Sequence, residues 1–234
     1  MIGPNEQGIV LLSGGLDSSL VLAKVLNQSS TLDKVVPMFI NYNQWPLVPE
    51  LEAVKKVCKQ LQAKSPVIIN MSTEGEEGTQ IGSVWGRSIA MVGIASMWAY
   101  THGDNYDYIA LGSHEGDVGP DCKPGDFDVW LNGTLFEGTK GRLRLELPIS
   151  SYDIEDIGRS IVDYKIPFQF MYSCYWHPVC GYKSENETYR CPGCRRKTLA
   201  MKAGGVSGKE LLDFPNGNFG GRTYQSSKSL AVGY

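Results

Sequence analysis

The sequence contains no run of about 18 apolar residues, and therefore no candidate membrane-spanning helix. Its first residues, MIGPNEQG, are polar and lack the basic region and apolar core of a secretion signal. A formal net charge of −3 argues against non-specific binding to nucleic acid. Internal repeats and low-complexity tracts are also absent. These absences predict a cytoplasmic protein that binds no membrane and makes no direct contact with nucleic acid.

Apolar residues are numerous enough for a sizeable core. Hydrophobic residues make up 42% of the 234 positions and charged residues 20%, as in ordinary globular proteins. A chain of this length fits one domain with a small appended module. We expect a main α/β domain over residues 1–172, a four-cysteine module over 173–200 and a tail over 201–234.

Apolar runs and helical periodicities alternate along the first third of the chain. Strands are predicted over residues 9–12, 34–42 and 66–71. Between them, one helix is expected to begin after Ser19 and another to cover residues 49–63. This β-α-β-α-β order favours a parallel sheet with helices on both faces.

The following segments are less regular. A helix over residues 88–101 is apolar nearly all round, which predicts that it is buried. A fourth strand is expected over 108–111, followed by a connection rich in Gly, Asp and Pro over 112–132. Connections of that length without secondary structure are usually functional. Further helices are expected over residues 154–164 and near 209–212.

A glycine-rich loop separates the first predicted strand from the first predicted helix. Glycines permit close backbone approach, and the first N–H groups of a helix point toward an anion placed there. The loop lacks the Lys-Ser/Thr ending of the GxxxxGK[ST] phosphate loop. An ordinary strand-to-helix turn with Ser or Asp capping is the alternative. The residues of this candidate anion site are Ser13, Gly14, Gly15, Leu16, Asp17, Ser18 and Ser19.

Polar segments follow three of the predicted strands, at residues 13–19, 41–45 and 112–117. In an open α/β sheet, ligands bind outside the carboxyl ends of the strands. The three segments are therefore expected to meet in a single cleft.

Four cysteines cluster late in the sequence with the spacing C-x5-C-x10-C-x2-C: Cys174, Cys180, Cys191 and Cys194. A C-x-x-C pair lets two thiolates reach one ion from a tight turn, and Zn²⁺ favours four such ligands in a closed site. A redox dithiol or two disulfides are the alternatives. His177 is an alternative to Cys180 as the fourth ligand. The sequence therefore predicts a structural zinc site.

The neighbouring basic run 195–197 has two interpretations. It offsets the negative charge of a zinc tetrathiolate, or it is a solvated face. Cys58 lies on the apolar face of a predicted helix and is expected to belong to the core. Cys122 lies in a polar loop near the predicted cleft, where a reactive thiol and an inert one are both open.

The motif SGGLDSS at residues 13–19 resembles the signature of the PP-loop ATP pyrophosphatases. Together with NYNQ at 41–44, GRS at 86–88, LGSHEGD at 111–117, PDC at 120–122 and the late cysteines, it resembles the 7-cyano-7-deazaguanine synthase (QueC) family over residues 8–200. This resemblance implies a Rossmann-like PP-loop fold, a homodimer and an ATP-dependent ligase. In that reaction ATP adenylates the carboxylate of 7-carboxy-7-deazaguanine, ammonia forms the amide, and a second ATP gives the nitrile.

The resemblance also implies roles for individual residues. The loop 13–19 would hold the pyrophosphate of ATP, or Asp17 would help to hold Mg²⁺. Arg87 would bind phosphate or the substrate carboxylate. Tyr42, Gln44 and Asp121 are candidates for the deazaguanine pocket, or they only shape their loops.

Departures from the family pattern lie near the expected cleft. Trp45-Pro46 stands where the family has Arg-His, and Tyr152-Asp153 stands where it has Asn-Lys. Lys140, Arg142 and Arg144 are candidates to supply the lost positive charge. These departures leave three alternatives open: a QueC-like protein of anti-phage defence with a protein or nucleotide acceptor, a non-catalytic nucleotide-binding module, and a tRNA thiolase that uses Cys122.

Overall fold

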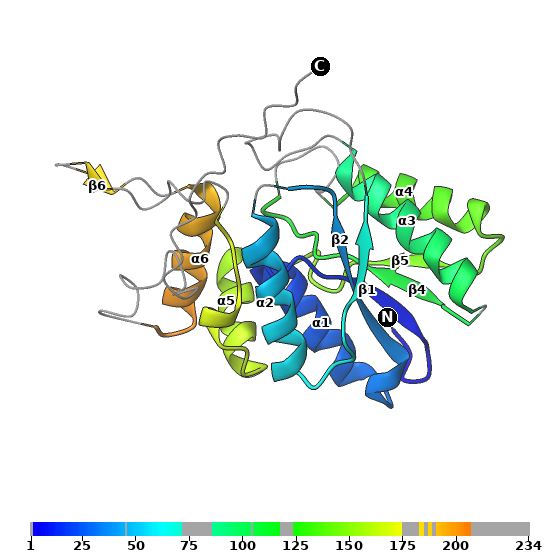
Figure 1. Ribbon diagram of the computed structural model, residues 1–234, viewed down its shortest axis with the longest axis horizontal. Coiled ribbons are helices and arrows are strands. Elements are labelled where there is room, and N and C mark those ends of the chain that lie inside the picture. Colours follow the sequence, from blue (N-terminus) through cyan, green and yellow to red (C-terminus); the bar gives the residue numbers. More distant parts are fainter. Residues whose placement is uncertain are drawn as a thin grey trace, which may run out of the picture.

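A five-stranded parallel sheet forms the centre of the computed structural model, with the strand order β3-β2-β1-β4-β5 (Figure 1). The structure describes residues 2–44, 46–71, 86–103, 105–117, 124–174, 183–184, 187–188 and 191–206. Ile9 of the central strand lies opposite Val36 on one side and Ile109 on the other. The strands are β1 (Gly8–Leu11), β2 (Val35–Asn41), β3 (Val67–Asn70), β4 (Tyr108–Ala110) and β5 (Arg144–Glu146).

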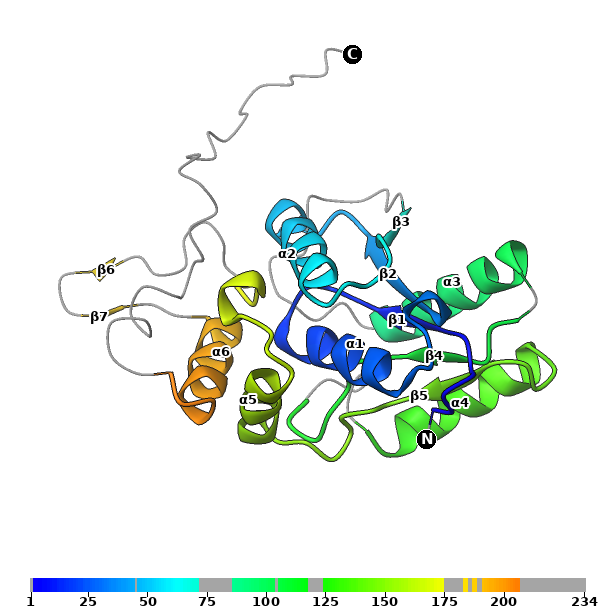
Figure 2. The same ribbon diagram turned by 90° about the horizontal axis from the view of Figure 1, so that it is seen from below.

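Helices cover both faces of the sheet (Figure 2). One face packs against α1 (Leu16–Gln28) and α2 (Leu47–Gln60). On the same side, α5 (Ile154–Asp163) packs on α1 and α6 (Pro192–Ala203) packs on α5. The other face packs against α3 (Arg87–His102) and α4 (Asp126–Gly138). Smaller elements are two 3-10 turns, Leu32–Lys34 and Phe168–Phe170, and the antiparallel pair β6 (Lys183–Ser184) and β7 (Glu187–Thr188).

Side-chain alternation in the central strands divides the core between the two faces. Val10 and Leu12 pack with α1 and α5, whereas Ile9 and Leu11 pack with α3 and α4. Both sets are at most 5% exposed. A strand buried on both faces reads as a continuous apolar run, which is why this strand was predictable from the sequence. The predicted Rossmann-like parallel fold is confirmed.

The prediction that the helix over residues 88–101 is buried all round is wrong. Val92, Ala95 and Ala99 of α3 face the sheet, but Met97 and Tyr100 are 70% and 75% exposed. Apolar composition alone does not assign a buried face when every face is apolar.

The prediction of an unstructured connection over residues 112–132 is also wrong in part. Helix α4 begins at Asp126, and the backbone N–H of Gly125 donates to Asp128 Oδ1 at 2.6 Å at its start. Leu131 and Leu135 bury one side of this helix against the sheet. The connection therefore returns the chain to the sheet as a regular crossover to β5.

The cysteine-bearing helix α6 packs on α5 and shares its core. Ala200 and Met201 belong to the same apolar cluster as α1 and α5. A Cβ atom added at Gly158 of α5 would overlap the carbonyl group of Ala200, so the two helices cross in close contact. The boundaries of a separate module over residues 173–200 stay a prediction, and the helix expected near 209–212 lies outside the described residues.

The topological switch point of the sheet lies beside β1, and it brings the loop after β1 close to the loop after β4. The chain moves outward from β1 to β3 and then returns to the opposite side of β1 as β4. A Cβ atom added at Gly112, after β4, would lie 2.9 Å from the backbone nitrogen of Ser18 in α1. Ligands of open α/β sheets bind at such a switch point. Within the part of the chain that the structure describes, no helix is long and apolar enough to cross a membrane.

Candidate functional site

The loop after β1 is held by its own serines and leaves the start of α1 open. Ser13 N donates to Ser18 Oγ at 3.1 Å, and the hydroxyls of Ser13 and Ser18 are also 3.1 Å apart. The residue before α1 is Gly15, which has no side chain to cap the helix. The alternative, a helix start capped by a Ser or Asp side chain, is therefore wrong. Uncapped N–H groups of a first turn suit an anion.

Gly14 has a backbone that only glycine adopts readily. Its φ is +78°, and an added Cβ would lie 2.8 Å from Ala53 Cβ and 2.9 Å from the carbonyl oxygen of Glu50. Its own carbonyl oxygen accepts a hydrogen bond of 2.8 Å from Tyr172 N. The loop is thus clamped between α2 and the segment that leads to Cys174.

A cavity of about 220 Å³ extends from this loop across the carboxyl ends of the strands. Its lining includes apolar side chains, among them Met38, Ile40 and Met91, together with polar ones. Apolar linings with a few placed polar groups are typical of small-molecule sites. Each predicted segment that the structure describes supplies polar lining residues: Ser13, Asp17, Ser18, Tyr42, Gln44, Arg87, Ser88, Ser113 and Asp117. The predicted single cleft is therefore present.

A cluster of charged groups occupies one end of the cavity. Asp17 Oδ1 lies 3.1 Å from Arg196 Nη2 and 3.8 Å from Nε2 of His114, which is buried. His114 N donates to Asp117 Oδ2 at 3.1 Å. Burial raises the pKa of Asp117, and the nearby His114 opposes that rise. The two carboxylates belong to the loops after β1 and β4, so the cluster spans the switch point.

A second polar network lies around Gln44, after β2. The side chain of Gln44 accepts from Tyr42 N at 3.0 Å and donates to Glu50 Oε2 at 2.9 Å. Arg87, at the start of α3, interacts with Tyr42 and Glu50 and lowers the pKa of both against the effect of burial. The predicted residues Tyr42, Gln44 and Arg87 are therefore brought together, with Glu50 added to them.

Glu50 gives this network a pH dependence. Burial raises the pKa of its carboxyl group from 4.5 to about 7, more than the Gln44 hydrogen bond and the Arg87 charge lower it. Between those two pH values the unfolded carboxyl releases its proton while the folded one keeps it. The folded state therefore loses stability relative to the unfolded state as pH rises through this window.

We predict that Glu50→Gln removes this loss. The free energy of unfolding of the wild type should fall relative to that of Glu50→Gln from about pH 4.5 to pH 7, measured by urea unfolding. Glu52→Gln, an exposed position on the same helix, serves as the matched control and should track the wild type. If the free energies of unfolding of the wild type and of Glu50→Gln change with pH in parallel across this range, the prediction is contradicted.

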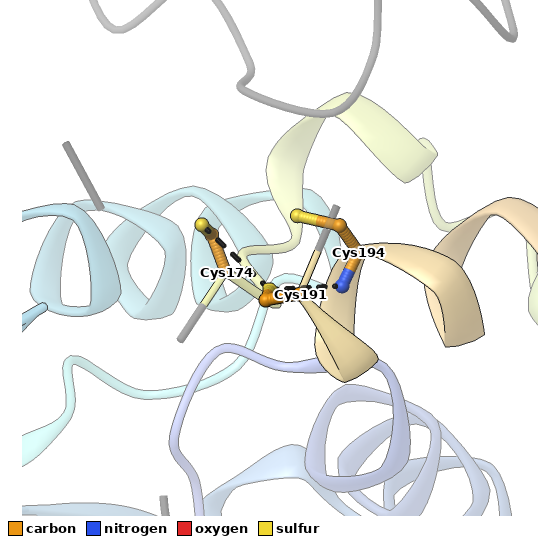
Figure 3. A group of neighbouring side chains, drawn as sticks. All are labelled: Cys174, Cys191 and Cys194. Atoms are coloured by element: carbon orange, nitrogen blue, oxygen red, sulfur yellow. Dashed lines mark hydrogen bonds between the residues drawn. The ribbon is translucent and has the colours of Figure 1, made fainter. Parts of the chain in front are cut away.

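Three cysteines converge beside the cavity (Figure 3). The Sγ atoms of Cys174, Cys191 and Cys194 all lie within 4.8 Å of one another, and each residue is at most 1% exposed. Cys191 precedes α6, and its Sγ accepts a hydrogen bond of 3.4 Å from Cys194 N. Buried, convergent thiols in this geometry fit a metal ion. The prediction that these three cysteines share a site agrees with this geometry, whereas Cys180 and His177 lie outside the described residues.

The remaining residues singled out from the sequence lie either in the core or outside the described part of the chain. Cys58 is buried in the core as expected, and burial raises the pKa of its thiol to about 12. Trp45, Asp121 and Cys122 lie outside the described residues.

The predicted replacement of the lost charge by Lys140, Arg142 or Arg144 is wrong. Arg144 lies at the amino end of β5, where its guanidinium binds Glu6 at 2.6 Å and Glu146 at 2.7 Å. Lys140 and Arg142 precede that strand, at the edge of the sheet away from the glycine loop.

Tyr152 and Asp153 support helices. Tyr152 Oη accepts from Lys24 Nζ of α1 at 2.8 Å, and Asp153 Oδ1 caps α5 by accepting from Asp156 N at 2.7 Å. These contacts give both residues a structural role.

The three residues of the basic run after Cys194 differ in exposure, so neither interpretation describes the whole run. Arg196 reaches into the cavity, and Lys197 is 3% exposed with its Nζ donating to the carbonyl oxygen of Met171 at 2.6 Å. Burial lowers the pKa of Lys197 to about 8. Arg195 is exposed and agrees with the interpretation of a solvated position.

Sequence reasoning missed Glu50, His114, Asp117 and Arg196 as individual site residues. His114 and Asp117 follow the fourth strand and could have been proposed from that position alone. Pro192 directly after Cys191 is a helix-start signal that would have placed Arg196 on a helix. Only the packing of α6 on α5 shows that its side chain reaches Asp17.

The parallel sheet, the glycine loop at its switch point and the adjacent buried thiols define the class: a Rossmann-like α/β protein with a ligand site at the carboxyl ends of its strands. The family profile described as "Queuosine biosynthesis protein QueC" matches residues 7–80 and 69–205. The chain therefore belongs to the QueC family.

Individual relatives agree with this family. The 7-cyano-7-deazaguanine synthase of Thermoplasma volcanium is 27% identical over 234 residues, which cover 90% of this chain and 92% of the relative. That of Nautilia profundicola is 25% identical over 223 residues, with 86% and 96% covered. Among solved structures, the U34-tRNA thiolase NcsA from Methanococcus maripaludis with its [4Fe-4S] cluster is 14% identical, with 91% of this chain and 67% of that chain covered and a TM-score of 0.44.

Proposed function

We propose that the chain is an ATP-dependent synthase that converts 7-carboxy-7-deazaguanine to 7-cyano-7-deazaguanine with ammonia, releasing AMP and pyrophosphate. The observation that carries this proposal is the cavity that joins the glycine loop to Arg87 and Gln44 in a QueC-family chain. The family relatives named as 7-cyano-7-deazaguanine synthases support the substrate and product.

Each end of the cavity would bind one part of the reactants. The loop 13–19 and the open start of α1 would bind the pyrophosphate of ATP through backbone N–H groups. Arg87 would bind the substrate carboxylate as a charge-assisted fork. Tyr42 and Gln44 would contact the base, and Asp121 stays a candidate for the same pocket. Mg²⁺, held with the help of Asp17, would neutralise charge on the departing pyrophosphate.

The bonds change in two rounds. A carboxylate oxygen attacks the α-phosphorus of ATP, and pyrophosphate leaves. Ammonia then attacks the activated carbonyl carbon, AMP leaves with one carboxylate oxygen, and the amide forms. In the second round the amide oxygen attacks the α-phosphorus of a second ATP, and pyrophosphate leaves. The two amide protons are then lost, and AMP departs with the amide oxygen to give the nitrile. Two ATP are therefore used for each nitrile.

The cysteine site would hold Zn²⁺ through Cys174, Cys191 and Cys194, with Cys180 as the expected fourth ligand and His177 as the alternative. Three buried thiols that converge without a disulfide fit this ion. Its function would be structural, because it would fix the start of α6 against the segment that binds the glycine loop.

The assay uses the purified protein with ATP, Mg²⁺, ammonium and 7-carboxy-7-deazaguanine. We expect AMP and pyrophosphate in equal amounts and one nitrile for every two AMP. ADP with inorganic phosphate would contradict the proposal. Tight ATP binding without turnover would favour a nucleotide-binding module, and a mass increase on a protein acceptor without free nitrile would favour the defence-type reaction. A homodimer stays a prediction of the family resemblance, and a cytoplasmic location stays a prediction from the composition of the sequence.

A further inference from the structure

Arg196 connects the cysteine site with the glycine loop. It lies on α6, two residues after Cys194, and its side chain lines the cavity. Its Nη2 lies 3.1 Å from Asp17 Oδ1 and contacts His114 Nε2, while its Nη1 lies 4.0 Å from Asp117 Oδ1. A guanidinium group is therefore fixed at the first turn of α1.

The charges that line the cavity indicate why the guanidinium group of Arg196 would matter for binding an anionic substrate. The described lining residues supply three carboxylates, Asp17, Glu50 and Asp117, and two arginines, Arg87 and Arg196. A polyphosphate would be repelled by this excess of carboxylates unless cations lie beside its binding loop. Arg87 interacts with the Tyr42 and Glu50 network, so Arg196 is the arginine paired with the carboxylate of the loop itself.

We propose that Arg196 binds the pyrophosphate part of ATP, and that Asp17 holds its guanidinium in place before the nucleotide arrives. This inference rests on the proposed function, in which the loop 13–19 binds that pyrophosphate. The planar fork of a guanidinium keeps one edge on a carboxylate while another edge binds phosphate oxygens. Arg196 is then a substrate-binding residue supplied by the helix of the cysteine site.

The alternative is that Arg196 only neutralises the charge of Asp17 and does not bind the nucleotide. Removal of the arginine would then weaken ATP binding because an unpaired carboxylate is left beside the phosphates. The double variant Asp17→Asn/Arg196→Ala separates the two roles, because it removes the carboxylate charge together with the arginine.

The experiment measures the affinity of the full-length protein for α,β-methylene-ATP and for AMP by calorimetry, without Mg²⁺. Arg196→Ala should bind the ATP analogue roughly tenfold to a hundredfold more weakly, as expected for lost charge-assisted hydrogen bonds. Its affinity for AMP, which lacks the pyrophosphate, should change less than about twofold. The double variant should remain as weak as Arg196→Ala, and Arg196→Lys should recover part of the affinity.

Arg195→Ala is the matched control, because Arg195 is the exposed neighbour on the same helix. It should bind both nucleotides like the wild type. Wild-type affinity of Arg196→Ala for the ATP analogue, or wild-type affinity restored in the double variant, would overturn the inference. Equal metal content and equal melting temperature of the variants exclude a loss of fold. If the wild type itself does not bind the analogue, the proposed function fails instead.

Discussion

Gly14→Ala is expected to lower the free energy of unfolding by roughly 2–5 kcal/mol, because two penalties add at this position. A left-handed backbone costs a residue with a Cβ about 1–2 kcal/mol, and overpacking typically costs another 1–3 kcal/mol. Gly14 has φ of +78°, and its added Cβ would lie within 3 Å of Ala53 and Glu50 in α2. The substitution would also strain the hydrogen bond from Tyr172 N to the Gly14 carbonyl group.

Gly15→Ala is the control for this effect. Gly15 has an extended backbone, and its added Cβ would lie no closer than 3.4 Å to a neighbouring atom. Urea unfolding should place Gly15→Ala within about 1 kcal/mol of the wild type. Equal stability of the two variants would contradict the assigned packing of α2 on the glycine loop.

Cys191→Ser is expected to lose the bound metal and several kcal/mol of folding stability, since the binding energy of a structural metal contributes to folding. Cys191 is fully buried, precedes α6 and receives a hydrogen bond from Cys194 N. Loss of the site frees the start of α6, which carries Arg196. ATP binding should therefore weaken together with metal content, measured by elemental analysis and calorimetry on the same samples.

Cys58→Ala is the control for this substitution, because Cys58 is buried in α2 and belongs to a different cluster from the three convergent thiols. It should keep the full metal content and the wild-type affinity for ATP. Stoichiometric zinc in Cys191→Ser would contradict the assigned ligand set. Iron with sulfide in the wild type would contradict zinc as the native metal.

The sequence predicts the central strands well because apolar runs buried on both faces are distinctive. Val35–Asn41 and the run before Ser13 illustrate this. Helix α4 was not predictable in the same way, because it contains Gly133 and exposes Val129 and Trp130, so it has no regular polar face. The exposed side of α3 was not predicted either, because this helix also has no regular polar face.

The candidate site was predictable where its residues follow strands or lie in a motif such as C-x-x-C. The loop 13–19, Tyr42 and Gln44 lie at strand ends, and topology alone brings them together. Arg196 comes from a helix near the end of the described chain and reaches Asp17 only because α6 packs on α5. Periodicity does not report such a long-range contact, and a C-x-x-C motif draws attention to metal binding rather than to its neighbours.

If the chain joins the substrate carboxylate to the adenylyl group of ATP, a carboxylate oxygen passes to AMP, and isotope labelling follows that oxygen. The substrate is 7-carboxy-7-deazaguanine with both carboxylate oxygens labelled with ¹⁸O, incubated with ATP, Mg²⁺ and ammonium. Mass spectrometry should find one ¹⁸O in each AMP and two labelled AMP for each nitrile formed. Unlabelled AMP, or label in inorganic phosphate, would contradict adenylation of the carboxylate.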